Sequence, residues 1–156
     1  MSFFVVLLSP PRQVKADQSG VFFLNLACGA EDTATILSYG LHPSTADTIS
    51  TVKVLCSVPA LDQTCKSLYS LLLPGGQWLV YEHVAAERRY PLSRFLQNIY
   101  QMPWPWLLGG CNINRDTEQS LRGAGEWEKV ELGRPANENG WELLGHVEGR
   151  LIKPRD

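Results

Sequence analysis

Hydrophobic residues along this chain gather in short runs that follow two different spacings. Three runs, rich in β-branched and aromatic residues, are typical of strands in a buried sheet: 21–26, 47–58 and 77–82. Between the second and third runs, apolar residues recur at steps of three and four, which predicts a helix whose buried face carries Leu61, Cys65, Leu68 and Leu72. Strands that alternate with helices indicate an α/β domain with a parallel sheet.

The remaining segments predict more helices, a hairpin and a linker. Helical patterns closed by glycine or proline occur over 31–39, 84–101 and 117–123. Two further strand-like runs, 127–132 and 141–153, can pair as an antiparallel hairpin across the Gly133–Gly140 loop. Residues 9–20 are polar and contain two prolines, so we expect a loop or linker there.

The first apolar run, Phe3–Leu8, leaves two interpretations open. It is too short to cross a bilayer, and it lacks the basic flank and small-residue cleavage site of a signal peptide. A buried strand and a leader without regular structure fit it equally well. We therefore expect a leader or linker of uncertain structure over 1–20 and the folded domain over 21–156.

Composition and charge narrow the range of functions. Hydrophobic residues make up 44% and charged residues 19% of the 156 residues, so one globular domain is expected. The formal net charge of −2 gives no basic surface, so neither nucleic acid nor an anionic membrane is an expected partner. No two of the four cysteines form a CxxC pair, which favours reduced thiols in a cytoplasmic protein and no metal site.

Several motifs in fixed order resemble one protein family. Leu55-Cys56-Ser57-Val58 precedes a helix, then Leu73-Pro74-Gly75-Gly76, then a strand that ends in Glu82-His83-Val84. The Pro103–Trp106 segment and Gly110-Cys111-Asn112-x-Asn114-Arg115-Asp116-Thr117 follow, and Cys28–Thr33 comes before. Together they resemble the class I S-adenosylmethionine (SAM)-dependent methyltransferases of the type 11 group. That group includes the thiol methyltransferase-like proteins of animals and many fungal relatives, and the resemblance covers residues 21–153.

This resemblance implies SAM as cofactor, a small-molecule methyl acceptor and a mostly parallel sheet in the strand order 3-2-1-4-5-7-6. Val21–Leu26, Thr48–Leu55 and Gln77–Glu82 correspond to strands three, four and five, and the terminal hairpin to strands six and seven. The family's glycine-rich cofactor loop belongs before strand three, and no GxGxG occurs in this chain. The expected fold class is therefore α/β, an incomplete Rossmann-like methyltransferase sheet, mostly parallel with a C-terminal antiparallel hairpin. A protein partner or a second copy could complete it.

The resemblance also assigns site residues. Cofactor contacts fall to Gly29-Ala30-Glu31 after strand three and to Leu55-Cys56-Ser57 after strand four. The acid/base candidates are Glu82 and His83, because an imidazole of near-neutral pKa can accept a proton from an attacking OH, NH or SH group. For Gly29-Ala30-Glu31 the structural alternative is a plain strand-to-helix turn. Cys56 is expected to line the pocket as a small residue. For His83 and Glu82 the alternative is a hydrogen-bonded loop histidine beside a solvated carboxylate.

Other polar and aromatic residues are expected to have structural roles. His42 and His146 lack supporting neighbours in the sequence, so they are expected to be structural or on the surface. Trp104, Trp106 and the 92–100 helix could form an aromatic lid, but core packing is the favoured alternative. Residues Asn112, Arg115 and Asp116 are expected to bind backbone groups and to cap the last helix.

Two functions from different classes follow. The first is SAM-dependent methyl transfer to a small acceptor, with secondary metabolism as the expected setting. The second is a non-catalytic methyltransferase-like protein with a binding or regulatory role, which the missing glycine loop favours. Another type of nucleotide-binding α/β enzyme is a weaker alternative, because no phosphate-cradling loop is visible.

Overall fold

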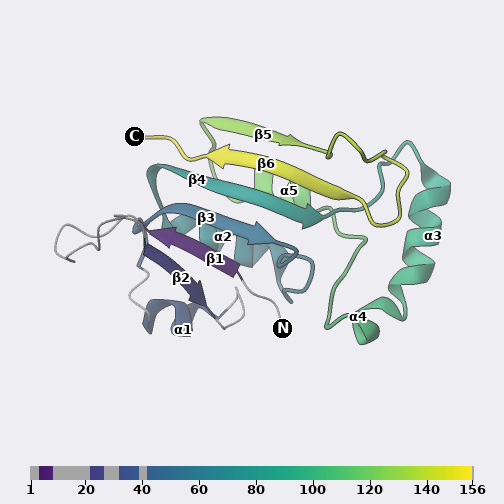
Figure 1. Ribbon diagram of the computed structural model, residues 1–156, viewed down its shortest axis with the longest axis horizontal. Helices are drawn as coiled ribbons and strands as arrows, with labels where there is room; N and C mark the ends of the chain where they lie inside the picture. Colours follow the sequence, from purple (N-terminus) through teal and green to yellow (C-terminus); the bar gives the residue numbers. More distant parts are fainter. Residues whose placement is uncertain (1–3, 9–21, 27–31, 39–41, 156) are drawn as a thin grey trace.

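The computed structural model describes residues 4–8, 22–26, 32–38 and 42–155, and its strands form one mixed sheet (Figure 1). In chain order the strands are β1 (Phe4–Leu8), β2 (Phe22–Leu26), β3 (Ala46–Val52), β4 (Leu72–His83), β5 (Lys129–Gly133) and β6 (His146–Ile152). The helices are α1 (Thr33–Ser38), α2 (Leu61–Leu71), α3 (Pro91–Gln101), α4 (Trp104–Leu107) and α5 (Thr117–Arg122). Helices α2 and α5 lie behind the sheet in this view, whereas α3 and α4 lie beyond one edge of it.

The sheet has the order β2-β1-β3-β4-β6-β5. Its α/β class and its C-terminal antiparallel hairpin, β5 with β6, confirm the expectation from sequence. The expectation of a mostly parallel sheet needs correction, because β3 with β4 is the only parallel pair among the described strands. The reason is β1, which enters between β2 and β3 and runs antiparallel to both. The Phe4–Leu8 run is thus a strand, and it fills one sheet position beside β3.

The main core lies between β3, β4 and the α2 face of the sheet. Ile49 of β3 pairs with Trp78 of β4, and both side chains are fully buried. Cys65 and Leu68 of α2 are also fully buried, as the spacing predicted, whereas Leu61 is only partly buried and Leu72 begins β4. The one polar atom of Trp78 is satisfied, because its Nε1 donates to Thr51 Oγ1 at 3.1 Å. Burial of large apolar side chains of this kind contributes roughly 1.5–3 kcal/mol each.

Some element bounds differ from the predicted ones for identifiable reasons. Strand β3 ends at Val52 rather than at residue 58, because Lys53 has a positive φ of 54° and turns the chain. Helix α3 begins at Pro91 rather than at residue 84, since proline suits the first helical position. Trp104–Leu107, where prolines predicted a break, forms the short helix α4. Among the described residues, no helix combines the length and apolar character that a membrane span requires.

Candidate functional site

The carboxyl ends of three strands meet at one edge of the sheet. Because β1 is antiparallel to both β2 and β3, those two strands run in the same direction, and β4 runs parallel to β3. The arrowheads of β2, β3 and β4 accordingly point to the same side in Figure 1, toward α3 and α4. Ligands of open α/β sheets bind outside this kind of edge. The candidate site is therefore built from the segments that follow β3 and β4.

Glu82, near the end of β4, holds the turn that follows β3. Its side chain is completely buried, and its two oxygens accept hydrogen bonds from the backbone N–H groups of Val54 and Leu55, at 3.0 and 3.1 Å. Burial raises the pKa of Glu82 to about 7, although these two N–H donors oppose the shift. The alternative of a solvated Glu82 is wrong, because alternation along β4 directs this residue into the protein with Trp78 and Val80.

The segment after α4 holds the same turn from its other side. Arg115 Nη1 donates to the carbonyl oxygens of Leu55 and Val58, at 3.1 and 2.5 Å. The backbone N–H and the side-chain Nδ2 of Asn112 both donate to the Cys56 carbonyl, at 2.8 and 3.2 Å. The predicted backbone-binding roles of Asn112 and Arg115 are thereby confirmed.

Cys56, His83 and Cys111 meet at the centre of this edge. The two sulfurs lie 3.2 Å apart, and Cys111 Sγ lies 3.5 Å from His83 Nδ1. Both cysteines are buried, and His83 is half-buried. The hydrogen bond with Cys56 is the main cause that lowers the pKa of Cys111 to about 7. The same bond and burial raise the pKa of Cys56 to about 12.

His83 is held in place by its neighbours. Its ring lies against that of His146, with 4.7 Å between centroids, and the His146 ring stacks on Tyr81 at 4.8 Å. Glu138 Oε1 contacts His146 Nδ1 at 2.6 Å, which fixes this second imidazole. Thr117 Oγ1 donates to the His83 carbonyl at 2.8 Å. His146 is thus structural, and His42 is exposed, as the sequence predicted.

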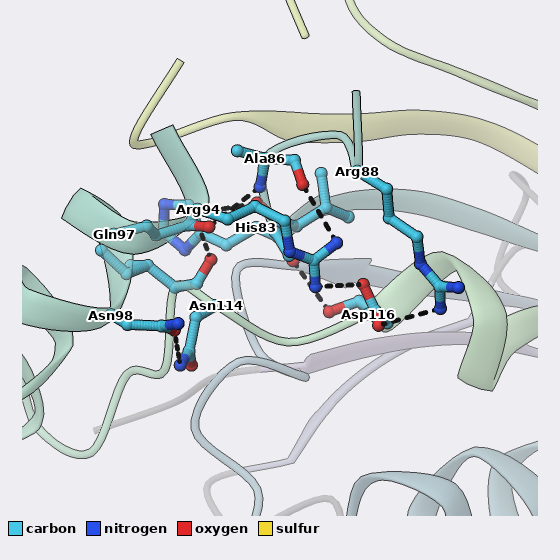
Figure 2. Close-up of polar contacts among 12 residues, drawn as sticks. His83, Ala86, Arg88, Arg94, Gln97, Asn98, Asn114 and Asp116 are labelled. Atoms are coloured by element: carbon cyan, nitrogen blue, oxygen red, sulfur yellow. Dashed lines mark hydrogen bonds and ion pairs between the residues drawn. The ribbon is translucent and has the colours of Figure 1, made fainter. Parts of the chain in front are cut away.

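Helix α3 attaches to the site through its polar side chains, as Figure 2 shows. Gln97 is buried, its Oε1 accepts from Ala86 N at 2.9 Å, and its Nε2 donates to the Ile113 carbonyl at 2.8 Å. Arg94 donates to Asp116 Oδ1 at 3.4 Å. Residue spacing had not singled out Gln97, since a lone glutamine in an amphipathic helix gives no signal of burial.

Two interpretations of this region need correction. Phe95, Ile99 and Trp106 are exposed, by 61%, 47% and 92%, so core packing of α3 and Trp106 is wrong in this structure. The half-buried Trp104 alone packs inward, against the cluster that contains Cys56 and Cys111. Asp116 precedes α5, but its side chain makes no capping hydrogen bond and pairs instead with Arg88 and Arg94 (Figure 2).

The residues assigned to cofactor binding are only partly described. Gly29, Ala30 and Glu31 lie outside the described residues. Leu55 and Cys56 are buried, and protein partners already use their backbone carbonyls and the Leu55 N–H. Ser57 is half-buried, and its N–H bonds to the Val54 carbonyl. The described residues therefore do not make a cradle for SAM by themselves.

A separate groove of about 710 Å³ opens beside the site, between the loop after β4 and α5. Arginines dominate its walls: Arg88, Arg89, Arg94, Arg122 and Arg134. Three acids, Glu87, Asp116 and Glu118, offset much of this charge. Cys56, His83 and Cys111 do not line this groove, so the cluster and the groove are two different places on the molecule.

Comparisons of sequence agree with the motifs. No model of a protein family matches the chain. The human protein "Thiol S-methyltransferase TMT1A" is 32% identical over 108 residues, which cover 69% of this chain and 43% of that protein. The human "Thiol S-methyltransferase TMT1B" is 27% identical over 115 residues, or 72% of this chain and 46% of that protein. The chain thus spans somewhat less than half the length of these curated relatives.

Comparisons of structure agree with the fold class. The crystal structure of the "[4+2]-Cyclase SpnF" superimposes with a TM-score of 0.52 and 18% identity, over 73% of this chain and 53% of that one. A SAM-dependent methyltransferase from Thermotoga maritima, described as a possible histamine N-methyltransferase, gives a TM-score of 0.47 and 20% identity, over 72% and 58% of the two chains. The mixed α/β sheet thus shares part of its fold with the first of these structures.

Proposed function

We propose, from its homology to SAM-dependent methyltransferases and its likeness to thiol S-methyltransferases, that this chain is the acceptor-side part of an enzyme that methylates small thiols. The proposal includes a reducing, cytoplasmic setting. Secondary metabolism remains the expected setting of the substrate. The human relatives are named for thiols, and a thiol is the acceptor whose ionisation the residues at this edge can assist.

One observation carries the proposal: a half-buried imidazole stands where three strands end. His83 terminates β4, and its Nδ1 faces the sulfur of Cys111. Its ring is fixed by His146, and its carbonyl is fixed by Thr117. A held imidazole nitrogen can accept the proton of a thiol as the sulfur attacks the methyl group. His83 is therefore proposed as the catalytic base, and Glu82 as the residue that positions the turn after β3.

SAM is the proposed methyl donor on the ground of homology. Leu55, Cys56 and Ser57 are proposed to close one side of its site, and Gly29-Ala30-Glu31 to contact it from the end of β2. The rest of the contacts is proposed to come from residues outside the described ranges, from a protein partner or from a second copy. The proposed role of the present residues is to hold the acceptor and to remove its proton.

Binding and turnover test this function directly. Equilibrium dialysis with labelled SAM should show binding, and SAM should raise the unfolding midpoint, because a ligand that binds only the native state stabilises it. With a small aliphatic thiol added, labelled methyl groups should appear on sulfur. Substitution His83→Asn should lower kcat by about 100-fold or more, the range of a lost general base, and leave SAM binding intact. The exposed His42→Asn is the matched control and should change neither quantity.

A second candidate function has its own support. The backbone carbonyls of Leu55 and Cys56 are already bound by Arg115 and Asn112, which suits a closed, non-catalytic binding or regulatory protein. Under that function, millimolar SAM would neither bind nor shift the midpoint, and no thiol would be methylated. That result would overturn methyl transfer for this chain.

A further inference from the structure

Three donor atoms of the kinds that hold soft metal ions lie together at the carboxyl edge. The Sγ atoms of Cys56 and Cys111 and a ring nitrogen of His83 all lie within 4.8 Å of one another. They come from three separate segments: the turn after β3, the end of β4 and the loop after α4. Residue spacing does not indicate such a group, because the two cysteines are 55 positions apart and His83 and Cys111 are 28 positions apart.

Two of the three separations are close to those around a small tetrahedral ion, and the third, between Cys56 Sγ and the His83 ring, lies within 4.8 Å. Zn–S and Zn–N bonds of about 2.3 and 2.0 Å place two ligand sulfurs roughly 3.7 Å apart and a sulfur and a nitrogen roughly 3.5 Å apart. The Cys111 Sγ to His83 Nδ1 distance is 3.5 Å, and the two sulfurs, at 3.2 Å, need to open by only about half an ångström. Each ligand sits on a segment held by hydrogen bonds, so the three donors are already gathered.

The surroundings of the cluster favour a cation there. Two buried thiolates are costly without a positive partner, whereas two thiolates and one divalent ion are neutral together. Two residues of opposite charge lie near the cluster. Arg115 interacts electrostatically with both cysteines, and Glu82 interacts with Cys56. Binding of the ion would release the thiol protons of Cys56 and Cys111 to solvent, because a cysteine binds zinc as its thiolate.

The cluster offers three protein donors and is not fully enclosed. His83 is half-buried, so the donors are not sealed from solvent. Trp104 packs against Cys56 and Cys111, and its buried Nε1 has no hydrogen-bond partner among the described residues. Zinc sites with three protein ligands and an open fourth position are those that do chemistry, whereas purely structural sites have four protein ligands.

We propose that Cys56, Cys111 and His83 form a three-ligand binding site for Zn²⁺, with an open fourth position. Two thiolates with one imidazole select zinc over hard ions such as magnesium and calcium. In the metal-bound form His83 Nδ1 is a ligand and no longer a base. Zinc then ionises a coordinating thiol itself. This last consequence rests on the proposed function, but the metal site does not.

Metal binding by the reduced full-length chain tests the site without any assay of activity. Titration with Co²⁺, a spectroscopic substitute for zinc, should give a thiolate-to-cobalt charge-transfer band that saturates at one equivalent and is displaced by Zn²⁺. Substitutions Cys56→Ser and Cys111→Ser should each weaken cobalt binding by about 100-fold or more, and His83→Asn by about 10-fold or more. Cys65→Ala, which removes a buried thiol of the main core, is the matched control and should leave the band unchanged.

A second measurement on the unmutated chain guards against variants that fail to fold. Alkylation followed by mass spectrometry should show that Zn²⁺ slows modification of Cys56 and Cys111, with no effect on Cys65. The site is overturned if reduced protein gives no charge-transfer band, if zinc protects Cys65 as strongly as the pair, or if a Cys56–Cys111 disulfide forms as fast with zinc as without it. None of these outcomes depends on SAM, so failure of the metal site and failure of the methyltransferase proposal are distinguishable.

Discussion

Helices α2 and α3 have the same length, 11 residues, and both are amphipathic, yet they attach to the protein by opposite faces. Helix α2 buries Cys65 and Leu68 against the sheet. Helix α3 buries only Gln97 and leaves its apolar side chains in solvent, with Leu92 69% and Phe95 61% exposed. Amphipathicity therefore shows that a helix has two faces but not which of them meets the rest of the chain.

The difference follows from what each helix lies against. Behind the sheet, α2 meets the apolar side chains of β3 and β4, so burial of its leucines is favourable. At the carboxyl edge, α3 meets loops whose backbone groups need partners, and Gln97 supplies them. Each buried polar group left without a partner costs about 1–3 kcal/mol, so a polar contact is the stabilising one there. Four predictions test this contrast.

The largest effect is expected on α2. Leu68→Ala should lower the free energy of unfolding by about 2–5 kcal/mol, because it removes a fully buried side chain and leaves a cavity. Leu92→Ala makes the same change on the exposed face of α3 and should cost less than about 0.5 kcal/mol. Urea denaturation of both variants measures the difference, and equal losses would contradict the contrast.

The reciprocal experiment exchanges a glutamine for leucine on each helix. Gln97→Leu should destabilise the protein by about 2–3 kcal/mol, since it leaves the Ala86 N–H and the carbonyls of Ile113 and Leu143 unpaired. Gln63→Leu, on the exposed side of α2, is the control and should be nearly neutral. A neutral Gln97→Leu would mean that α3 does not attach through this residue.

A smaller effect concerns pH and the buried thiol of α2. Burial raises the pKa of Cys65 from its ordinary value of 9.0 to about 12. The folded protein therefore keeps this thiol neutral at a pH at which the same thiol ionises in the unfolded chain. Stability that depends on the neutral thiol is present below pH 9 and declines as the pH rises above it. Between pH 8 and 10 the loss is about 1.4 kcal/mol. The Cys65→Ala variant should show a decline smaller by this amount when both proteins are melted across that range, because Cys56 still contributes its own share.

The smallest change in stability is expected on the exposed face of α3. Phe95→Ser should alter the free energy of unfolding by less than about 0.5 kcal/mol, because the ring has little contact to lose. It should also reduce binding of a hydrophobic dye, since exposed apolar patches attract such probes. A loss of more than about 2 kcal/mol would show that this face is covered in solution.

The sequence by itself determined the helix and strands of the main core, and its motifs indicated a likeness to methyltransferases. Apolar spacing located α2 and the strands around it, and the terminal hairpin followed from two short runs with a turn between them. Ordered motifs led to the methyltransferases, and comparison with curated relatives supports that likeness. These features are local, because residues within one turn or one strand report their own periodicity.

Only the tertiary structure decided what meets at the carboxyl edge. It placed β1 between β2 and β3, turned the polar face of α3 inward, and brought the sulfurs of Cys56 and Cys111 to 3.2 Å of each other. No local spacing encodes such contacts, since they depend on strand order and on how loops from distant segments fold over one edge. Side chains far apart in the chain become neighbours when the sheet assembles, and the chemistry of this protein depends on those neighbours.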